Sequence, residues 1–293
     1  MKITKGIILA GGNGSRLYPL TLGTSKQLLP VYDKPMIYYP LSILIQAGII
    51  EILVITTKTD INKFKTLLGD GTNLGIKIQY EIQAQPNGIA ESFLIGENFI
   101  GSNNVCLILG DNIFHGDNFF KYIKKAQKNL HDGYSSIFGV EVDNPENFGV
   151  INLDNNNKLL RIAEKPKNPK SSLIVSGIYF YTNDVVNISK SLNLSSRGEK
   201  EITDINNYYI SKKKLKLNLL DKSISWIDTG TYSSLIRASK YFENHENTTG
   251  EKVSCVEETS FKMGYIDRHM LKKIAISMQT SDYGKYLLKI LKK

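Results

Sequence analysis

The feature of this sequence that most limits its fold is a regular alternation of strand-like and helix-like segments before residue 111. Short apolar runs predict buried strands, and apolar residues at helical spacing predict helices. The expected strands are residues 5–10, 51–57, 77–82 and 104–110, and the expected helices are 36–47 (with Pro35 at the first position), 60–68 and 88–100. This alternation predicts an α/β fold with a Rossmann-like, doubly wound and mostly parallel sheet. Such sheets bind ligands beyond the carboxyl ends of their strands.

The middle of the chain follows a different pattern. Residues 148–153 and 158–164 are strand-like around the turn at 154–157, which predicts a β-hairpin. Further strands are expected at 173–181, 215–220 and 224–227, and further helices at 201–210, at 231 to about 244, and over much of 261–293. With no internal repeat or low-complexity linker, we expect a catalytic body over residues 1–245 that contains an inserted β-region, followed by a helical C-terminal appendage over 246–293.

Composition excludes several classes of function. No apolar run reaches the length of a membrane span, and no signal peptide is visible, so a cytoplasmic protein is expected. The net charge of +9 comes from lysines spread along the chain, whereas nucleic-acid binders concentrate their charge in a stripe or tail. The two cysteines and four histidines form no ligand cluster, so any metal must be held by carboxylates, which favours Mg²⁺.

A glycine-rich turn directly follows the first expected strand. Gly11, Gly12 and Gly14 allow the backbone to approach a ligand closely and to direct N–H groups at phosphate oxygens. The planar guanidinium group of Arg16 can bind a phosphate through two parallel hydrogen bonds, and Lys26 supplies a second cation ten residues later. The Lys-Ser/Thr pair of a Walker A loop is missing, as are the third glycine and the acidic residue of a dinucleotide fingerprint. An ordinary tight turn is the alternative.

The pattern around this turn resembles the signature of sugar nucleotidylyltransferases. The residues that carry the resemblance are Gly11-Gly12-Asn13-Gly14-Ser15-Arg16, Pro19-Leu20-Thr21 and Lys26-Gln27-Leu28-Leu29-Pro30. The continuation from Val31 to Pro40 resembles the glucose-1-phosphate thymidylyltransferase branch of that family, and the likeness extends along almost the whole chain. It implies an enzyme that joins dTTP to glucose 1-phosphate, gives dTDP-glucose and releases pyrophosphate.

Two aspartates at strand ends are candidate metal ligands. Asp111 directly follows the expected strand at 104–110, and Asp228 directly follows the expected late strand at 224–227. Transfer from a triphosphate needs a metal ion that neutralises developing charge, and the resemblance implies that these two aspartates hold Mg²⁺. Each also has a structural alternative: Asp228, for example, is placed to cap the helix that starts near Thr231.

The resemblance also implies roles for residues on the two substrate sides. On the nucleotide side, Gln83 reads the pyrimidine edge, and Gly88, Ser15 and Gln27 add contacts. On the sugar side, Lys165 binds the phosphate and Glu164 accepts from the sugar hydroxyls, beside Asn112, Gly149, Val175 and Trp226. Arg16 and Lys26 would stabilise the leaving pyrophosphate in a direct displacement with no covalent enzyme intermediate. The alternative for the sugar side is an ordinary hairpin with a core tryptophan.

The resemblance further implies a homotetramer with a second nucleotide site for feedback control. That site would use residues after Gly110-Asp111-Asn112 and residues of the C-terminal segment. The stretch from Ile113 to Phe120 departs from the family form, in which tyrosine is common where His115 stands. Three other functions stay open: the same reaction with UTP, a non-catalytic sugar-nucleotide sensor, and a nicotinamide-dependent oxidoreductase. The presence of Arg16, Lys165 and both aspartates disfavours the sensor.

Overall fold

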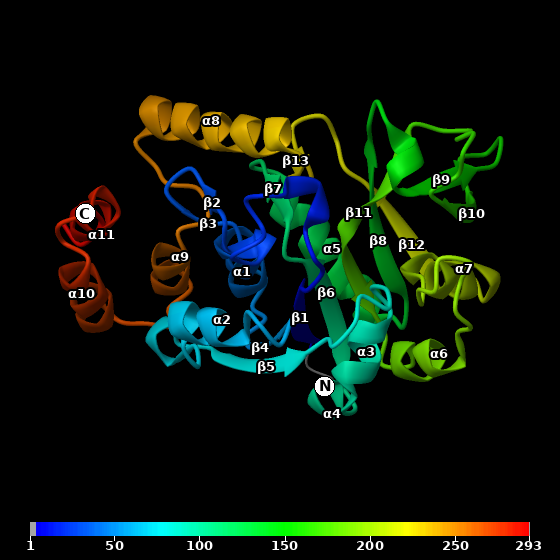
Figure 1. Cartoon of the computed structure of the whole chain (residues 1–293), viewed down its shortest axis with the longest axis horizontal. Coiled ribbons are helices and arrows are strands. Elements are labelled where there is room, and N and C mark those ends of the chain that lie inside the picture. Colours follow the sequence, from blue (N-terminus) through cyan, green and yellow to red (C-terminus); the bar gives the residue numbers. More distant parts are fainter. Residues whose placement is uncertain (1–3, 293) are drawn as a thin grey trace.

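A nine-stranded mixed sheet forms the centre of the molecule in this computed structural model, which describes residues 4–292 (Figure 1). Its strands are β1 (Thr4–Ala10), β4 (Glu51–Thr56), β5 (Lys77–Ile82), β6 (Asn104–Leu109), β8 (Ser135–Glu141), β9 (Gly149–Leu153), β10 (Leu159–Glu164), β11 (Leu173–Tyr181) and β12 (Leu215–Leu219). They lie in the order β10-β9-β11-β6-β1-β4-β5, with β8 and β12 attached beside β11.

The parallel half of the sheet confirms the expected doubly wound arrangement. β1 is central and pairs in parallel with β4 on one side and with β6 on the other, and β4 pairs in parallel with β5. The chain therefore adds β4 and then β5 on one side of β1, and afterwards returns to add β6 on the other side. Loops that follow β1 and β6 separate at this point and leave room for a ligand. β11 runs antiparallel to β6, which makes the sheet mixed.

Helices cover both faces of the sheet because its strands are apolar on both sides. One face is covered by α1 (Tyr38–Gln46), α2 (Ile61–Leu68) and α5 (Phe119–His131), and the other by α3 (Glu91–Ile95), α4 (Glu97–Ile100), α6 (Val185–Ser191) and α7 (Ile202–Ser211). Successive side chains of β1 point to opposite faces of the sheet: Ile8 packs against the first group of helices and Ile7 against the second.

The inserted β-region and two short ribbons complete the body. β9 and β10 form the expected antiparallel hairpin. One of the two ribbons pairs β7 (Asn112–His115) with β13 (Ser225–Asp228), and the other pairs β2 (Pro30–Val31) with β3 (Lys34–Pro35). Four 3₁₀ turns lie at Ser15–Leu17, Lys26–Leu28, Thr72–Leu74 and Pro145–Asn147.

The C-terminal part is helical, as expected. α8 (Tyr232–Thr249) continues past residue 245, and α9 (Val256–Lys262), α10 (Arg268–Ser277) and α11 (Asp282–Ile290) share a small core of their own, at the edge of the molecule in Figure 1. α9 also packs on α1, where the Ser42 and Thr259 hydroxyls lie 3.0 Å apart. None of the helices in residues 4–292 combines the length and apolar character that crossing a membrane requires.

Several expected element boundaries are wrong, for identifiable reasons. The helix expected from Met36 begins at Tyr38, because Met36 and Ile37 donate their N–H groups back to Leu29 and Gln27 and so extend the β2–β3 hairpin. Pro35 accordingly lies in β3 and not at the first helical position.

The helix expected over 88–100 is two short helices that meet at Gly96, and it begins only at Glu91. Ala90 donates its N–H to Lys200, which keeps the preceding residues out of the helix. The patterns of α5, α6, β7 and β8 were not recognised in the sequence.

Candidate active site

The glycine turn after β1 brings Arg16 to the switch point of the sheet. Gly12 and Gly14 have φ angles of 91° and 58°, a region that favours glycine. The Thr21 hydroxyl fastens the turn by donating to the Gly14 carbonyl at 2.8 Å. Gly230 comes within van der Waals distance of the guanidinium, since a Cβ added there would lie 3.2 Å from Arg16 Nη2. Arg16 thus lies beside the segment that follows β13.

Lys26 joins the two aspartates. Its Nζ lies 2.6 Å from Asp111 Oδ2 and 3.9 Å from Asp228 Oδ1, and the side chain is buried. Asp111 and Asp228 meet because the β7–β13 ribbon pairs Asn112 with Asp228. Two strand ends that are over a hundred residues apart in the chain therefore present their carboxylates to one ammonium group.

The two carboxyl groups have opposite pKa shifts. Burial alone would raise the pKa of Asp111, but the nearby Lys26 ammonium outweighs burial and holds it below its ordinary value. Burial and then the charge of Asp111 raise the pKa of Asp228, although Lys26 and Arg16 oppose that rise. Asp228 does not cap α8, because Thr231 and Ser234 form the capping box there. Its carboxylate stays at the site.

The base-side residues also lie at this point. Gln83 follows β5, and its backbone N–H donates to the Thr56 carbonyl at 2.8 Å. Its side-chain Oε1 lies beside the glycine turn, 2.8 Å from where a Cβ on Gly11 would be. Gly88 has a φ of 102°, and a Cβ there would lie 2.3 Å from the Lys200 carbonyl oxygen, so this position requires glycine.

The sugar-side residues lie on the neighbouring hairpin and ribbon. Gly149 and Glu164 are partners in the β9–β10 ladder. Asn112 Oδ1 accepts from Trp226 Nε1 at 2.7 Å and from the Gly177 N–H at 3.2 Å. The Trp226 ring packs against Phe148, with ring centroids 5.5 Å apart.

Lys165 and Val175 were the two remaining sugar-side residues expected. Lys165 Nζ lies 4.0 Å from Glu164 Oε1 and has no ion pair with the described residues Asp111 and Asp228. Val175 is a buried residue of β11. Lys26, Asp111 and Asp228 thus form one ion-pair cluster. Arg16 lies next to this cluster, since its guanidinium and Asp228 Oδ2 both approach Gly230, while Lys165 lies at the end of the adjacent hairpin.

Arg197 and Thr203 are functional candidates that the sequence reasoning missed. Arg197 Nη2 lies 3.4 Å from Glu164 Oε1 and 2.8 Å from Glu201 Oε2, and the Thr203 hydroxyl donates to Glu164 Oε2. The hydrogen bonds to Glu201 raise the pKa of Arg197. The sequence does carry one signal for Arg197, because this arginine stands next to Gly198 in a polar stretch between two periodic segments.

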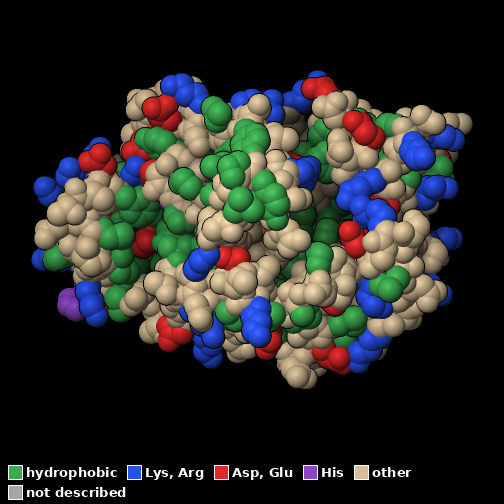
Figure 2. Space-filling view, in the orientation of Figure 1, with side chains coloured by type: hydrophobic (Ala, Val, Ile, Leu, Met, Phe, Trp, Pro, Cys, Tyr) green, Lys and Arg blue, Asp and Glu red, His purple; other side chains and the backbone are tan. Residues whose placement is uncertain are grey.

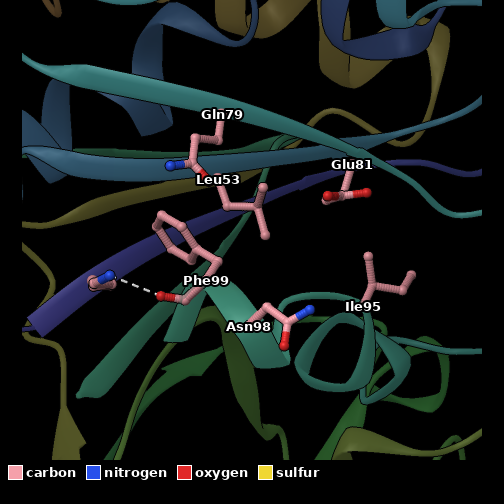
Figure 3. Close-up of a pocket in the computed structure, with 7 residues that line it drawn as sticks. Leu53, Gln79, Glu81, Ile95, Asn98 and Phe99 are labelled. Carbon is pink, nitrogen blue, oxygen red and sulfur yellow. Dashed lines mark hydrogen bonds between the residues drawn. The ribbon is translucent and has the colours of Figure 1, made fainter. Parts of the chain in front are cut away.

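The surface is hollowed at this location, whereas the two cavities described here lie elsewhere on the molecule. Figure 2 shows a hollow between the centre of the molecule, where β1 ends, and the lobe that carries β9 and β10. A separate recess of about 230 Å³ lies between β5 and α4, where Lys5 donates to the Phe99 carbonyl at 2.8 Å (Figure 3). It contains none of the predicted site residues. A cavity of about 400 Å³ near β7 and α9 is described below.

The fold and the site together define a class of protein. A glycine turn, two cations and two carboxylates lie at the switch point of a doubly wound sheet, which is the arrangement expected of an enzyme that acts on a nucleotide. Among residues 4–292 no three His, Cys, Asp or Glu side chains cluster as a metal site, so a metal here would use the two aspartates and oxygens of its substrates.

Comparison with known proteins places the chain more narrowly. The model of the nucleotidyl transferase family matches residues 5–245. The chain is 48% identical to a glucose-1-phosphate thymidylyltransferase of Neisseria meningitidis over 99% of this chain and 100% of the relative. It is 47% identical to a Mycobacterium tuberculosis protein of the same name over 99% of both chains. This chain therefore belongs to the nucleotidyl transferase family, whose members generally use a divalent metal.

Solved structures support the same placement. A Bacillus anthracis protein assigned as a glucose-1-phosphate thymidylyltransferase, crystallised with sucrose, is 43% identical, with a TM-score of 0.75 over 82% of this chain and 95% of that one. A UDP-glucose pyrophosphorylase at 24% identity shares the fold, with a TM-score of 0.71 over 83% of this chain and 99% of that one.

Proposed function

We propose that this chain transfers the deoxythymidylyl group of dTTP to α-D-glucose 1-phosphate, giving dTDP-glucose and pyrophosphate. The observation that carries the proposal is the convergence of Arg16, Lys26, Asp111 and Asp228 at the switch point. The names of the full-length relatives support the choice of substrates. The resemblance in sequence further implies that this reaction is the first step of dTDP-rhamnose or deoxysugar synthesis.

The nucleotide would lie along the glycine turn. Backbone N–H groups there suit a triphosphate, and the Arg16 and Lys26 charges lie where pyrophosphate would leave. The base would lie beside Gln83, whose Oε1 faces the turn at Gly11 and whose Nε2 holds the Gly88 carbonyl next to it. The residues assigned to the nucleotide are Gly11, Gly12, Gly14, Ser15, Gln27, Gln83 and Gly88.

Glucose 1-phosphate would bind between the β9–β10 hairpin and the β7–β13 ribbon. Glu164 offers acceptor oxygens to sugar hydroxyls, and Lys165 offers a charge that offsets repulsion between the two phosphates. The residues assigned to the sugar phosphate are Asn112, Gly149, Glu164, Lys165, Val175 and Trp226.

Asp111 and Asp228 fit a magnesium ion. Their hard carboxylate oxygens suit Mg²⁺, which keeps several positions for water and phosphate oxygens and so needs few protein ligands. Both already converge on one cation, the Lys26 ammonium. When bound, the metal would neutralise charge on the phosphates.

The remaining work of this chain is positioning. Lys165 holds the sugar phosphate so that its oxygen can attack the α-phosphorus in line with the departing pyrophosphate, and Arg16 and Lys26 offset the charge that develops on that leaving group. One P–O bond forms as another breaks, so no covalent enzyme intermediate is needed.

A pyrophosphate-release assay tests the proposal. Glucose 1-phosphate is supplied with Mg²⁺ and with dTTP or UTP in parallel, and turnover is expected with dTTP. Higher efficiency with UTP would establish the uridylyl alternative. Tight nucleotide-sugar binding without turnover would establish the sensor alternative.

Arg197→Ala is expected to lower kcat/KM for glucose 1-phosphate about 10- to 100-fold, because Glu164, Glu199 and Glu201 lose a shared charge-assisted donor. The KM for dTTP should change little. Steady-state kinetics with each substrate varied in turn measures both effects, and Arg237→Ala, an exposed arginine of α8, is the matched control. Equal losses for both substrates would contradict a role on the sugar side.

We also propose that residues 246–293 form an oligomer contact of a homotetramer and part of a regulatory nucleotide site. The cavity of about 400 Å³ supports this, because it is lined by His115 at the end of β7, by Gly116, and by residues between 251 and 263. Sedimentation velocity tests the tetramer. Non-competitive inhibition by nucleotide sugars tests the site, and purely competitive inhibition would argue against it.

A further inference from the structure

The side-chain amide of Gln83 is held in one of its two possible orientations. The side chain is only 7% exposed. Its Nε2 donates to the Gly88 carbonyl at 3.1 Å and to Glu91 Oε2 at 2.8 Å, which uses both amide hydrogens. Its Oε1 accepts from none of the described residues 4–292 and lies on the opposite side, facing the glycine turn at Gly11.

Glu91 makes this orientation the stable one. An ionised carboxylate only accepts hydrogen bonds, and its second oxygen accepts from Asn87 Nδ2 at 2.8 Å. If the Gln83 amide turned over, Oε1 would face both this carboxylate and the Gly88 carbonyl, so three acceptors would meet with no hydrogen between them. A hydrogen bond to a charged group is also stronger than one between neutral groups.

We propose that Glu91 is a positioning residue that selects the nucleobase through Gln83. By fixing the amide, it presents an acceptor to the base, and that acceptor pairs with a ring N–H donor. Thymine and uracil offer such a donor at N3, whereas cytosine, a base of the same size, has an acceptor at N3. The inference rests on the proposed nucleotide site and deepens it: the site takes 2,4-dioxopyrimidine nucleotides and rejects cytidine nucleotides.

Discrimination between dTTP and UTP is a different property of the site from discrimination between dTTP and dCTP. dTTP and UTP share the N3 donor, so Glu91 does not distinguish between them. dTTP and dCTP share the sugar and the triphosphate, so the ratio of their efficiencies isolates the base edge. A site built to hydrogen-bond a substrate N–H rejects an analogue that lacks it, because buried polar groups are then left unpaired.

The test compares kcat/KM for dTTP and dCTP in the wild type and in Glu91→Ala and Glu91→Gln, at saturating glucose 1-phosphate. Glu91→Ala should lower the dTTP-to-dCTP ratio about 10- to 100-fold, because the amide then loses its charged acceptor. Glu91→Gln should retain most of the ratio, since its carbonyl can accept from Gln83 while its NH₂ group meets a reoriented Asn87. Glu97→Ala, half-exposed and paired with Lys190 in the first turn of α4, is the matched control.

The dissociation constants of dTTP and dCTP are measured in parallel, so that a loss of base selection can be distinguished from a loss of transfer activity. An unchanged ratio in Glu91→Ala, or an equal loss for both nucleotides, would overturn the inference. If the wild type binds dTTP over dCTP but transfers neither, the proposed function fails while the base-selection inference is still tested by the binding ratio. Thermal unfolding of each variant separates a folding defect from lost selection.

Discussion

Asp111→Asn is expected to lower kcat about 100- to 1000-fold, the usual effect of removing one preorganised electrostatic group from a transition state. Asparagine keeps the shape of the side chain but removes the negative charge. Asp111 is the nearer partner of the buried Lys26 ammonium, at 2.6 Å, and one of only two carboxylates placed to hold the metal among the described residues. The substitution therefore weakens metal binding and leaves Lys26 without its main counter-charge.

Pyrophosphate release at several Mg²⁺ concentrations measures this effect. The variant should need more Mg²⁺ for half-maximal rate, and its maximal rate should stay low, because excess metal cannot replace the contact with Lys26. Asp132→Asn, at an exposed aspartate after α5, serves as the control and should behave as wild type. If the variant shows normal turnover, Asp111 has no catalytic role, and the proposed assignment of the metal ligands is wrong.

The parallel half of the sheet and its binding edge were predictable because they depend on local patterns. Residues 7–10 and 105–109 are apolar runs, each followed directly by glycine, and such runs predict buried strands from local sequence alone. Once both are parallel strands, their carboxyl ends must lie at the same edge. Arg16 and Asp111 could thus be assigned to one site before any coordinates.

Other parts could not be predicted because they depend on distant partners. Met36 and Ile37 match a helical pattern, yet their N–H groups pair with Leu29 and Gln27, which no periodicity reveals. Arg197 becomes a candidate only because α7 places its preceding loop against Glu164. Gln83 was assigned to the base from resemblance, but the orientation of its amide follows only from the contact with Glu91.

Lys252 is the clearest case of a residue whose importance is invisible in the sequence. It is one of many lysines in a chain of net charge +9, and a lysine is most often solvated. Here its side chain is 3% exposed, and its Nζ lies 2.8 Å from Asp33 Oδ2 and 2.7 Å from Glu246 Oε2. Three tyrosine rings surround the ammonium, with centroids within 6 Å: Tyr32, Tyr283 and Tyr286.

This ion cluster joins the C-terminal appendage to the catalytic body. Asp33 lies in the turn of the β2–β3 hairpin, whose neighbour Tyr32 has a φ of 59° that costs energy for a residue other than glycine. Met36, at the base of the hairpin, accepts a hydrogen bond at its sulfur from the Thr229 hydroxyl, next to Asp228. Lys252 therefore stabilises a strained turn that contacts the active-site segment through Met36 and Thr229.

Lys252→Met is expected to lower the free energy of unfolding by about 3 kcal/mol, because the partly buried Glu246 carboxylate loses its cation and Asp33 keeps only Lys34 of its two cations. Burial alone would lower the pKa of Lys252, but hydrogen bonds to these two carboxylates outweigh burial and raise it, so the charged lysine is the form that the fold stabilises. Urea denaturation measures the loss. Lys240→Met removes an exposed ion pair with Glu243 on α8 and should cost no more than about 1 kcal/mol.

A third variant separates lost charge from lost packing. Lys252→Met combined with Glu246→Gln removes the lysine together with a carboxylate that pairs with it, while Asp33 keeps its ion pair with the buried Lys34. This double variant should recover part of the stability, because Glu246 then carries no unpaired charge. If the double variant is less stable than Lys252→Met alone, the Glu246 carboxylate is not destabilised by losing the lysine. In that case Lys252 stabilises the protein chiefly through contact of its methylene chain with the tyrosine rings.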